Sequence, residues 1–293
     1  VLADLKKQAV DEFSERDLHT LTFRNHLEEA TFKDMVTKAK KFIRQGDMFQ
    51  CVLSQRFSAD ISGKPLDFYR NLRITNPSNY LYFYDFGDYQ IIGASPESLV
   101  SLKNGVVTTN PIAGTRPRGA NDQKDKDLSE ELLSDVKEVA EHRMLVDLGR
   151  NDIGKIAEVG SVQVTKYMEV EFFRYVMHLT SVVKGKLLSG LTGMDALKST
   201  LPAGTVSGAP KIRAMKRIYE LEKEKRGIYA GAIGYLSASG DMDFAIAIRT
   251  MIIKNQKAYV QAGAGIVYDS VPENEYYETI NKAKAMTRIG EIQ

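Results

Sequence analysis

The sequence contains a single cysteine, Cys51, in 293 residues, so it can form no intrachain disulfide and fits a reducing compartment best. No apolar run approaches the roughly 20 residues that a membrane-spanning helix needs. The N-terminus also lacks the basic segment followed by an apolar one that marks a secretory signal. These absences predict a soluble, cytoplasmic protein.

An excess of charge of one sign is missing as well. The 40 Lys and Arg residues nearly balance the 38 Asp and Glu residues, and the two signs are mixed along the chain. No basic stripe therefore marks a nucleic-acid or membrane surface. Hydrophobic residues make up 43% and charged residues 27%, which is typical of a globular protein with a large core. We expect neither nucleic acid nor membrane as a partner.

Familiar nucleotide and thiol motifs are also absent. The segment 201–211, LPAGTVSGAPK, predicts a glycine-rich turn before a helix, whose N–H groups and hydroxyls could bind an anion. It does not have the residue order of a Walker loop. Cys51 has no glycine-flanked elbow and is expected to be a small core residue. The sequence therefore predicts neither a nucleotide substrate nor glutamine hydrolysis.

Apolar periodicity and turn signals predict antiparallel strands with helices inserted between them. Helices are expected at 31–46, after Pro65, and at 128–148, 194–201, 212–224 and 272–289. Strands are expected at 48–57, 80–86, 89–94, 99–103, 106–109, 159–166, 175–183, 229–237, 242–253 and 257–266. This order favours an α+β fold over a doubly wound sheet. We expect residues 1–29 to be a leader or the remnant of an N-terminal region, and residues 30–293 to form one catalytic domain.

A glycine-rich segment and a nearby arginine form the first candidate site. Gly263 and Gly265 are expected where a strand gives way to a loop, with exposed N–H groups that could bind carboxylate or phosphate. A bulged turn is the alternative. Arg249 lies in an otherwise apolar strand candidate and therefore needs an anionic partner, which could be a substrate or a structural salt bridge.

Carboxylates on two predicted helices form the second candidate site. Glu273, Glu275 and Glu278 begin the last helix, with Lys282 four residues after Glu278, although such a pair is also common on a solvated face. The helix 128–148 could supply a second carboxylate, because Glu138, Glu141 and His142 lie beside its apolar stripe. Two carboxylates without a cysteine or histidine cluster favour Mg²⁺ over zinc. His178 lies in an apolar strand, where it could be a hydrogen-bonded core residue or a base.

Seven segments together resemble the chorismate-utilising enzymes, in order and with that family's spacing, from about Thr31 to Ile289. They are PIAGTRPRG (111–119), EHRMLVDLGRND (141–152), VMH (176–178), 201–211, YAGA (229–232), IRT (248–250) and QAGAG (261–265). Within the family, the pattern is most similar to the large subunits of anthranilate synthases. The resemblance implies a chorismate-binding α+β fold, an antiparallel β-sheet sandwich with helices outside. It also implies conversion of chorismate and ammonia to anthranilate and pyruvate in tryptophan biosynthesis.

The resemblance also implies roles for individual residues. Mg²⁺ would be held by Glu141 and Glu278. The ring carboxylate of chorismate would bind this ion and the backbone amides of Gly263, Ala264 and Gly265. The enolpyruvyl carboxylate would bind the side chains of Tyr229 and Arg249. Further pocket positions are Gly114, Thr115, Thr205 and Lys282. His178 matches the histidine tied to pyruvate elimination, and Glu97 the acid that protonates the departing C4 hydroxyl, which requires a raised pKa.

Two positions distinguish sibling reactions within this family. Aminodeoxychorismate synthases typically carry a lysine nucleophile where this chain has Ala113, and isochorismate and salicylate synthases a lysine base where it has Gln50. Neither residue here can perform those steps, so attack by external ammonia is favoured. The siblings, and a catalytically silent chorismate-binding regulatory subunit, remain the alternatives.

The resemblance further implies a partner and an inhibitor site. Ammonia would come from a glutamine amidotransferase subunit, anthranilate synthase component II. The family's large subunits normally begin with a further domain that contributes to tryptophan inhibition, and no matching region is found in this sequence. Positions that match the rest of the inhibitor site are Asn79, Tyr80 and Leu81, with Asn79 standing where the family usually has proline.

Overall fold

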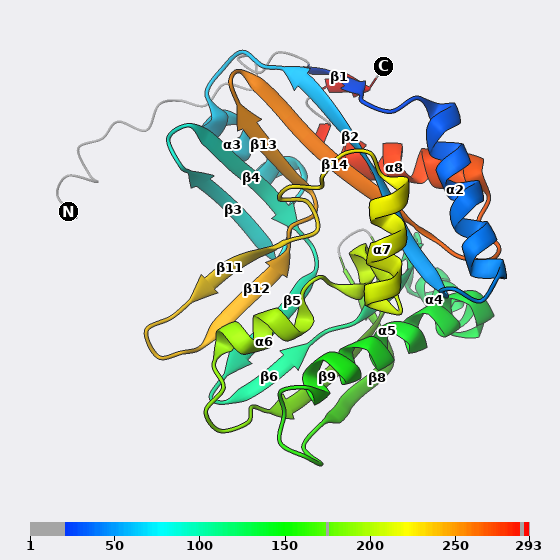
Figure 1. Ribbon diagram of the computed structural model, residues 1–293, viewed down its shortest axis with the longest axis vertical. Helices are drawn as coiled ribbons and strands as arrows, with labels where there is room; N and C mark the ends of the chain where they lie inside the picture. The colour runs from blue at the N-terminus through cyan, green and yellow to red at the C-terminus, as the bar shows by residue number, and fades with distance from the viewer. Residues whose placement is uncertain (1–20, 174–175, 288–289, 293) are drawn as a thin grey trace.

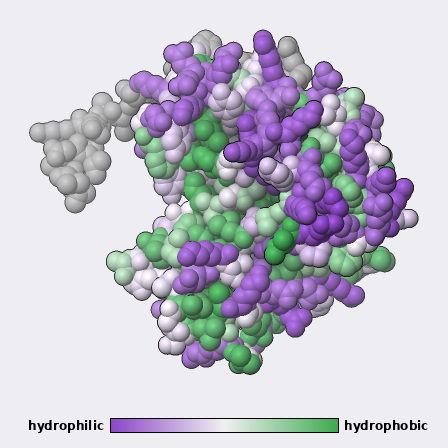
Figure 2. All heavy atoms as spheres, in the orientation of Figure 1, coloured by the Kyte–Doolittle hydropathy of each residue, from purple (hydrophilic) through white to green (hydrophobic). Residues whose placement is uncertain are grey.

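The computed structural model describes residues 21–173, 176–287 and 290–292, and within them two β-sheets lie face to face with helices outside (Figure 1). Every strand pairing in these ranges is antiparallel except that of β1 with β15. The predicted α+β class with an antiparallel sandwich is confirmed. In Figure 2, hydrophobic residues come to the surface in the hollow between the two halves.

The first sheet follows the order β15-β1-β2-β14-β13-β4-β3 in the described residues, and β10 pairs with β2 beside this path. Its core contains fully buried aromatic residues such as Phe23 and Phe57. The strands are β15 (Gly290–Ile292), β1 (Leu21–Asn25), β2 (Gln50–Asp60), β14 (Lys257–Ile266), β13 (Thr250–Lys254), β4 (Tyr89–Ser95), β3 (Tyr80–Asp85) and β10 (Gly208–Ala209).

The second sheet follows the order β11-β12-β5-β6-β9-β7, and β8 pairs with β9 beside this path. A separate apolar cluster, which includes Val100, Val107 and Val183, fills its covered face. The strands are β11 (Ala232–Leu236), β12 (Met242–Ile246), β5 (Ser98–Lys103), β6 (Val106–Thr109), β9 (Val176–Lys186), β7 (Ile112–Pro117) and β8 (Gln163–Phe172).

The helices divide between the two sheets. Next to the first sheet lie α2 (Glu29–Arg44), α3 (Pro65–Thr75), α7 (Lys211–Leu221) and α8 (Pro272–Thr287). Next to the second lie α4 (Asp122–Ser134), α5 (Val136–Gly154) and α6 (Gly193–Thr200), while the short 3₁₀ turn η2 (Gly204–Val206) contacts α5 and β14. None of the helices in the described part of the chain is long and apolar enough to cross a membrane.

The single helix expected over 128–148 is wrong, because the chain breaks at Asp135. This residue has an extended backbone (φ −71°, ψ 105°), and its carboxylate accepts the N–H groups of Lys137 and Glu138. It is therefore the N-cap of α5, and α4 ends just before it. The sequence signal for this break is Asp135 itself, a preferred N-cap residue followed three residues later by Glu138.

The single strand expected over 242–253 is also wrong. The chain pairs with the second sheet as β12 and with the first as β13, and residues 247–249 cross between them. Arg249 takes the left-handed conformation there, with φ 50°. Arg249 thus lies in the crossover and not in a strand. The expected strand at 229–237 likewise begins only at Ala232, so Tyr229 precedes it.

Smaller differences concern element limits. Part of the expected leader forms β1, in which Leu21 and Phe23 are buried, and residues 1–20 lie outside the described residues. The strand expected at 159–166 is displaced to β8, and residues 288–289 of the expected last helix are not described. Cys51 is fully buried, as expected for a core residue, and burial raises its pKa to about 12.

Replacing the N-cap residue Asp135 by alanine is predicted to lower the free energy of unfolding by about 1 kcal/mol, since two N–H groups of α5 lose their acceptor. Asp135→Asn, which can still cap, should retain most of that stability. Urea unfolding followed by circular dichroism measures both. Asp147→Ala, which removes an exposed pair with Arg150, is the control. Equal loss in Asp147→Ala and Asp135→Ala would contradict the capping role.

Candidate active site

Two glycines of β14 allow side chains to approach the backbone closely. A Cβ on Gly263 would lie 2.6 Å from the Tyr229 hydroxyl, and one on Gly265 would lie 2.7 Å from Gln50 Nε2. Both glycines pair with β2 in the last part of β14, which ends at Ile266 as the strand expected at 257–266 does. On its other side, β14 pairs with β13 only as far as Val260, so the glycine segment extends beyond the end of β13.

Glu97 lies in the short link between β4 and β5, and the pKa of its carboxyl group is strongly raised. Burial raises the pKa of Glu97 to about 7, against the opposing effects of the Thr205 hydroxyl and the Lys282 charge. The Thr205 hydroxyl is itself buried and has no full hydrogen bond within the described ranges. Both residues line a small cavity of about 50 Å³. A carboxyl group with this pKa can donate a proton near neutral pH.

Tyr229 and Arg249 stand in adjoining turns between the two sheets. The N–H of Ala230 donates to the carbonyl of Ala247, which ties the two turns together. Arg249 Nη1 donates to the Lys282 carbonyl at 3.2 Å, and burial lowers the pKa of Arg249 while Tyr229 opposes the shift. The acceptor recorded for this guanidinium is a neutral carbonyl, so its positive charge is available to an anionic ligand.

Helix α8 brings a lysine and a carboxylate to the same place. Lys282 Nζ donates to the carbonyl of Gly263 at 3.1 Å and to Glu278 Oε1 at 2.5 Å. The expected pair is therefore present, and it contacts the glycine strand. Glu278 is exposed, whereas Glu275 is buried, and burial raises the pKa of Glu275.

Helix α5 supplies a second carboxylate. Burial, followed by repulsion from Glu138, raises the pKa of Glu141. Gln50 Nε2 lies 3.4 Å from Glu141 Oε1, while Gln50 Oε1 is buried without a partner among the residues described. The charges of Lys137 and Lys282 act on both Glu141 and Glu275, which places the carboxylates of α5 and α8 in one electrostatic neighbourhood.

This neighbourhood fits a hard cation better than zinc. The described ranges contain no group of three or more His, Cys, Asp or Glu side chains that could hold a metal by themselves. Two carboxylates would leave most coordination positions to water and substrate oxygens, as Mg²⁺ prefers. A cation would also relieve the repulsion that Glu141 experiences from Glu138.

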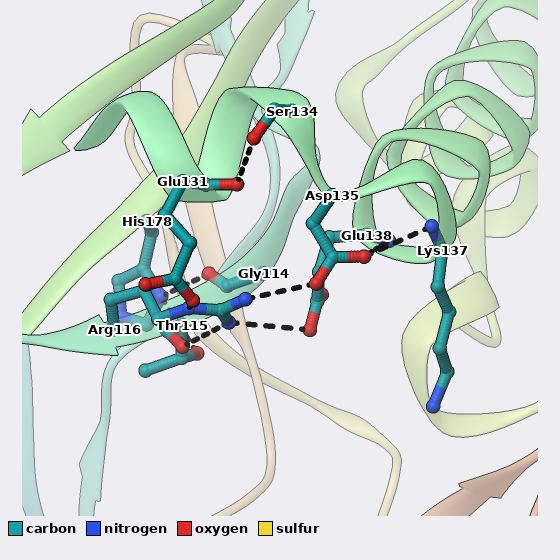
Figure 3. A network of polar contacts seen from close by, with 9 residues as sticks. All are labelled: Gly114, Thr115, Arg116, Glu131, Ser134, Asp135, Lys137, Glu138 and His178. Carbon is teal, nitrogen blue, oxygen red and sulfur yellow. Dashed lines mark hydrogen bonds and ion pairs between the residues drawn. The ribbon is translucent and has the colours of Figure 1, made fainter. Parts of the chain in front are cut away.

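His178 lies apart from these groups, on β9 opposite Thr115 of β7 (Figure 3). Its Nδ1 is 2.9 Å from the Gly114 carbonyl and 3.1 Å from Thr115 Oγ1. Because a carbonyl only accepts, a neutral His178 bonded to it carries its proton on Nδ1, and no hydrogen-bond partner of Nε2 is found within the described ranges. The sequence left a hydrogen-bonded core residue and a base as alternatives; the ring is half-buried and hydrogen-bonded, and its role stays a prediction.

Arg116 links the His178 region to the carboxylate helix. Its Nε donates to Glu131 at 3.0 Å and its Nη2 to Asp135 at 2.9 Å, and Nη1 lies 3.7 Å from Glu138 (Figure 3). Gly114 is also close to α5, since a Cβ there would lie 3.3 Å from Glu138 Oε2. Strand β7 and the first turn of α5 are thereby held together.

The remaining predicted residues are placed as follows. Ala113 is partly buried on β7 opposite Leu179. The residues proposed for an inhibitor site lie at or just before the edge strand β3, where Tyr80 donates to Asp243 of β12 at 3.0 Å. They therefore lie on the contact between the two sheets and not beside the glycine strand.

Sequence reasoning missed two charged residues at this site. Glu222 and Arg226 form a buried pair next to Tyr229, with the Arg226 guanidinium 5.5 Å from the centre of the Tyr229 ring. Their spacing of four residues, at the end of a helix and just before Gly-Ile-Tyr, was the available signal.

Comparisons with known proteins identify the family to which this chain belongs. Residues 3–288 match the family model of chorismate binding enzymes. Anthranilate synthase component 1 of Lactococcus lactis subsp. lactis (strain IL1403) is 58% identical over 98% of this chain, and that of Aquifex aeolicus (strain VF5) is 56% identical over 92%. The crystal structure of anthranilate synthase component I from Streptococcus pneumoniae TIGR4 superposes with a TM-score of 0.92 at 74% identity, covering 98% of this chain and 64% of that one.

A protein with a different named product shares the fold. The menaquinone-specific isochorismate synthase of Escherichia coli superposes with a TM-score of 0.83 at 25% identity, covering 93% of this chain and 64% of that one. The chain spans only 62% and 55% of the length of the Lactococcus and Aquifex relatives. The family match nevertheless covers nearly all of its residues. The chain therefore belongs to the chorismate binding enzymes.

Proposed function

We propose that this chain carries the synthase activity of an anthranilate synthase, which converts chorismate and ammonia to anthranilate and pyruvate. The observation that carries the proposal is the buried Glu97, whose pKa of about 7 lets it act as an acid, within the electrostatic reach of Lys282, which bonds to the glycine strand. High identity to proteins named anthranilate synthase component 1 supports it. The activity would reside in residues 30–293 and serve tryptophan biosynthesis in the cytoplasm.

The two carboxylates of chorismate have separate binding groups in this proposal. The enolpyruvyl carboxylate meets the Tyr229 hydroxyl and the Arg249 guanidinium, which has no carboxylate acceptor of its own in the described structure. The ring carboxylate meets the backbone of Gly263, Ala264 and Gly265. Gly114 and Thr115 complete the pocket on the second sheet.

Magnesium is held by Glu141 and Glu278 in this proposal, and it supplies positive charge for the ring carboxylate. Lys282 already neutralises part of the charge on Glu278. The repulsion between Glu138 and Glu141 means that nearby protein cations do not fully neutralise the negative charge of these two carboxylates. The bound cation and the anionic substrate would therefore stabilise each other's binding.

Proton transfers at the two ends of the substrate are assigned to different residues. Glu97 gives its proton to the C4 hydroxyl, which leaves as water while ammonia adds at C2. His178 Nε2 then takes the proton from C2, the ring becomes aromatic, and the C3–O bond breaks so that the enolate of pyruvate leaves and takes up a proton at its methylene carbon to give pyruvate. Because Ala113 and Gln50 cannot act as a nucleophile or a base, the nucleophile is external ammonia.

Ammonia would be supplied by a glutamine amidotransferase subunit. The relatives' name, component 1, denotes one part of a multisubunit enzyme. The only cysteine of this chain is fully buried, and burial raises its pKa to about 12, so it cannot act as a glutaminase thiolate. Tyr80, Leu81 and Asn79 are proposed to contribute to an inhibitor site on β3.

A product assay tests the proposal. The purified chain is mixed with chorismate, Mg²⁺ and an ammonium salt, and anthranilate is followed by its fluorescence. Mass spectrometry of the mixture distinguishes anthranilate from aminodeoxychorismate and isochorismate. Either sibling product, or chorismate binding without turnover by a folded protein, would overturn the proposal.

Glu97→Gln is predicted to lower kcat by roughly 10²- to 10⁴-fold, because an amide cannot protonate the leaving hydroxyl. Wild-type kcat should fall as the pH rises above about 7, where Glu97 loses its proton, and the variant should lack this limb. Burial disfavours the charged carboxylate, so stability is lost as pH rises through this pKa. At pH 8 the free energy of unfolding of the variant should therefore be higher than that of the wild type by about 1 kcal/mol. Glu130→Gln, on the surface of α4, is the control.

Glu141→Gln and Glu278→Gln are each predicted to weaken Mg²⁺ binding roughly tenfold or more, because loss of a direct ligand costs at least as much as loss of an outer partner. Isothermal titration with Mg²⁺, with and without chorismate, measures this independently of turnover. Glu273→Gln in the first turn of α8, where the side chain is exposed and pairs with Lys33, should bind as wild type does. Unchanged Mg²⁺ affinity in both site variants would show that Glu141 and Glu278 are not the metal ligands.

His178→Ala is predicted to slow anthranilate release by roughly 10²- to 10⁴-fold while amination continues, because only the second step needs a base at Nε2. The aminated intermediate should then accumulate and appear in mass spectra of the quenched reaction. His26→Ala, which removes an exposed ring bonded to Ser58, is the control. Loss of chorismate consumption in His178→Ala would place His178 in the first step instead.

A further inference from the structure

The ion pair of Glu222 and Arg226 is buried beside the proposed site and has no role in the steps above. Glu222 is 7% and Arg226 17% exposed. Arg226 Nε lies 2.8 Å from Oε2 and Nη2 lies 2.7 Å from Oε1, so the contact is bidentate. Such a pair is costly to bury unless its remaining donors and acceptors are also satisfied.

Those remaining groups connect the pair to the strands and turns that build the site. Arg226 donates to the carbonyls of Val206 and Val52, each at 2.6 Å. Val206 follows Thr205, whose hydroxyl acts on Glu97, and Val52 pairs with Gly265. One planar guanidinium thus fixes η2 and β2 at the same time, which a lysine ammonium could not reproduce.

Glu222 makes the matching connections on the acidic side. Its Oε1 accepts the N–H of Ser54 at 2.8 Å and the Ser54 hydroxyl at 2.9 Å. Ser54 Oγ in turn accepts from Gln261 Nε2 at 2.8 Å, two residues before Gly263. The carboxylate is therefore tied directly to β2 and, through Ser54 and Gln261, to β14, the strand that carries the glycine segment.

Tyr229 is the substrate-contacting residue nearest the pair. The Arg226 guanidinium lies over its ring at 5.5 Å, and the Tyr229 hydroxyl packs on Gly263. Burial raises the pKa of Tyr229 to about 12, with Arg226 opposing, so the hydroxyl keeps its proton and acts as a donor. The orientation of the Tyr229 hydroxyl depends on the contacts of its ring, because Gly263 has no side chain that would restrict the ring.

We propose that Glu222 and Arg226 are positioning residues that fix the Tyr229 hydroxyl over Gly263 for recognition of a substrate carboxylate. They touch no substrate atom and act through Tyr229 and the two strands. This inference rests on the proposed function, since it assigns the Tyr229 hydroxyl a carboxylate to bind. Changes to the pair should therefore raise KM for chorismate more than they lower kcat.

A double-mutant cycle tests the coupling. Arg226→Lys, which keeps the charge and loses the fork, is expected to raise KM for chorismate about tenfold, and Tyr229→Phe to do so by a similar factor. If Arg226 acts through Tyr229, the double variant should be little worse than Tyr229→Phe alone. Arg150→Lys, at an exposed ion pair, is the matched control and should leave KM unchanged. Thermal unfolding of each variant is recorded alongside.

Two outcomes overturn the inference. Single-variant factors that multiply in the double variant would show that Arg226 and Tyr229 act independently. A fall in kcat and thermal stability with KM unchanged would show a structural role only. Glu222→Gln in wild-type and Tyr229→Phe backgrounds repeats the cycle should Arg226→Lys fail to fold. An inactive wild-type chain would instead count against the proposed function, so the two failures are distinguishable.

Discussion

The close approach of side chains to the backbone of β14 is the constraint on which the site depends. Gly263 and Gly265 have no Cβ, so a tyrosine hydroxyl and a glutamine amide can occupy the space where side chains of a strand would stand. A larger residue at either position would displace Tyr229 or Gln50. The glycines therefore do not mark a loop; they create a flat strand surface against which polar groups from both sheets are placed.

Electrostatics in the site follow from burial more than from pairing. The pKa of Glu97 rises to about 7 because its carboxyl is desolvated, and Arg249 and Tyr229 shift away from their charged forms for the same reason. Of Glu97, Arg249, Tyr229 and Lys282, it is Lys282 that has a hydrogen bond to a carboxylate within the described residues. The same region therefore combines a buried acid with the positively charged side chains of Arg249 and Lys282.

The elements that sequence predicts well are those with a clear period, whereas the breaks inside them are set by tertiary contacts. The hairpins and the helices at both ends follow from local pattern, but the break at Asp135 depends on capping and on the distant Arg116. The crossover at Arg249 depends on two sheets competing for one apolar run. Arg249 and His178 stand out because a charged or titratable side chain is unusual in an apolar strand pattern, whereas Glu97, Gly114, Thr115 and Thr205 are candidates only through the family resemblance. Glu222 and Arg226 were missed because an i,i+4 pair looks the same whether it is exposed or buried.

Arg116 joins helix α5 to the strand that lies beside His178. Strand β7, which carries the carbonyl bonded to His178, is joined through Arg116 to the capping residue of the helix that bears Glu141. His178 of β9 is bonded to Gly114 of β7, and Arg116 of β7 is bonded to Asp135, so the imidazole and the start of α5 share one chain of hydrogen bonds. Loss of Arg116 would therefore remove in one step the side-chain bonds that join β7 to α4 and to the cap of α5.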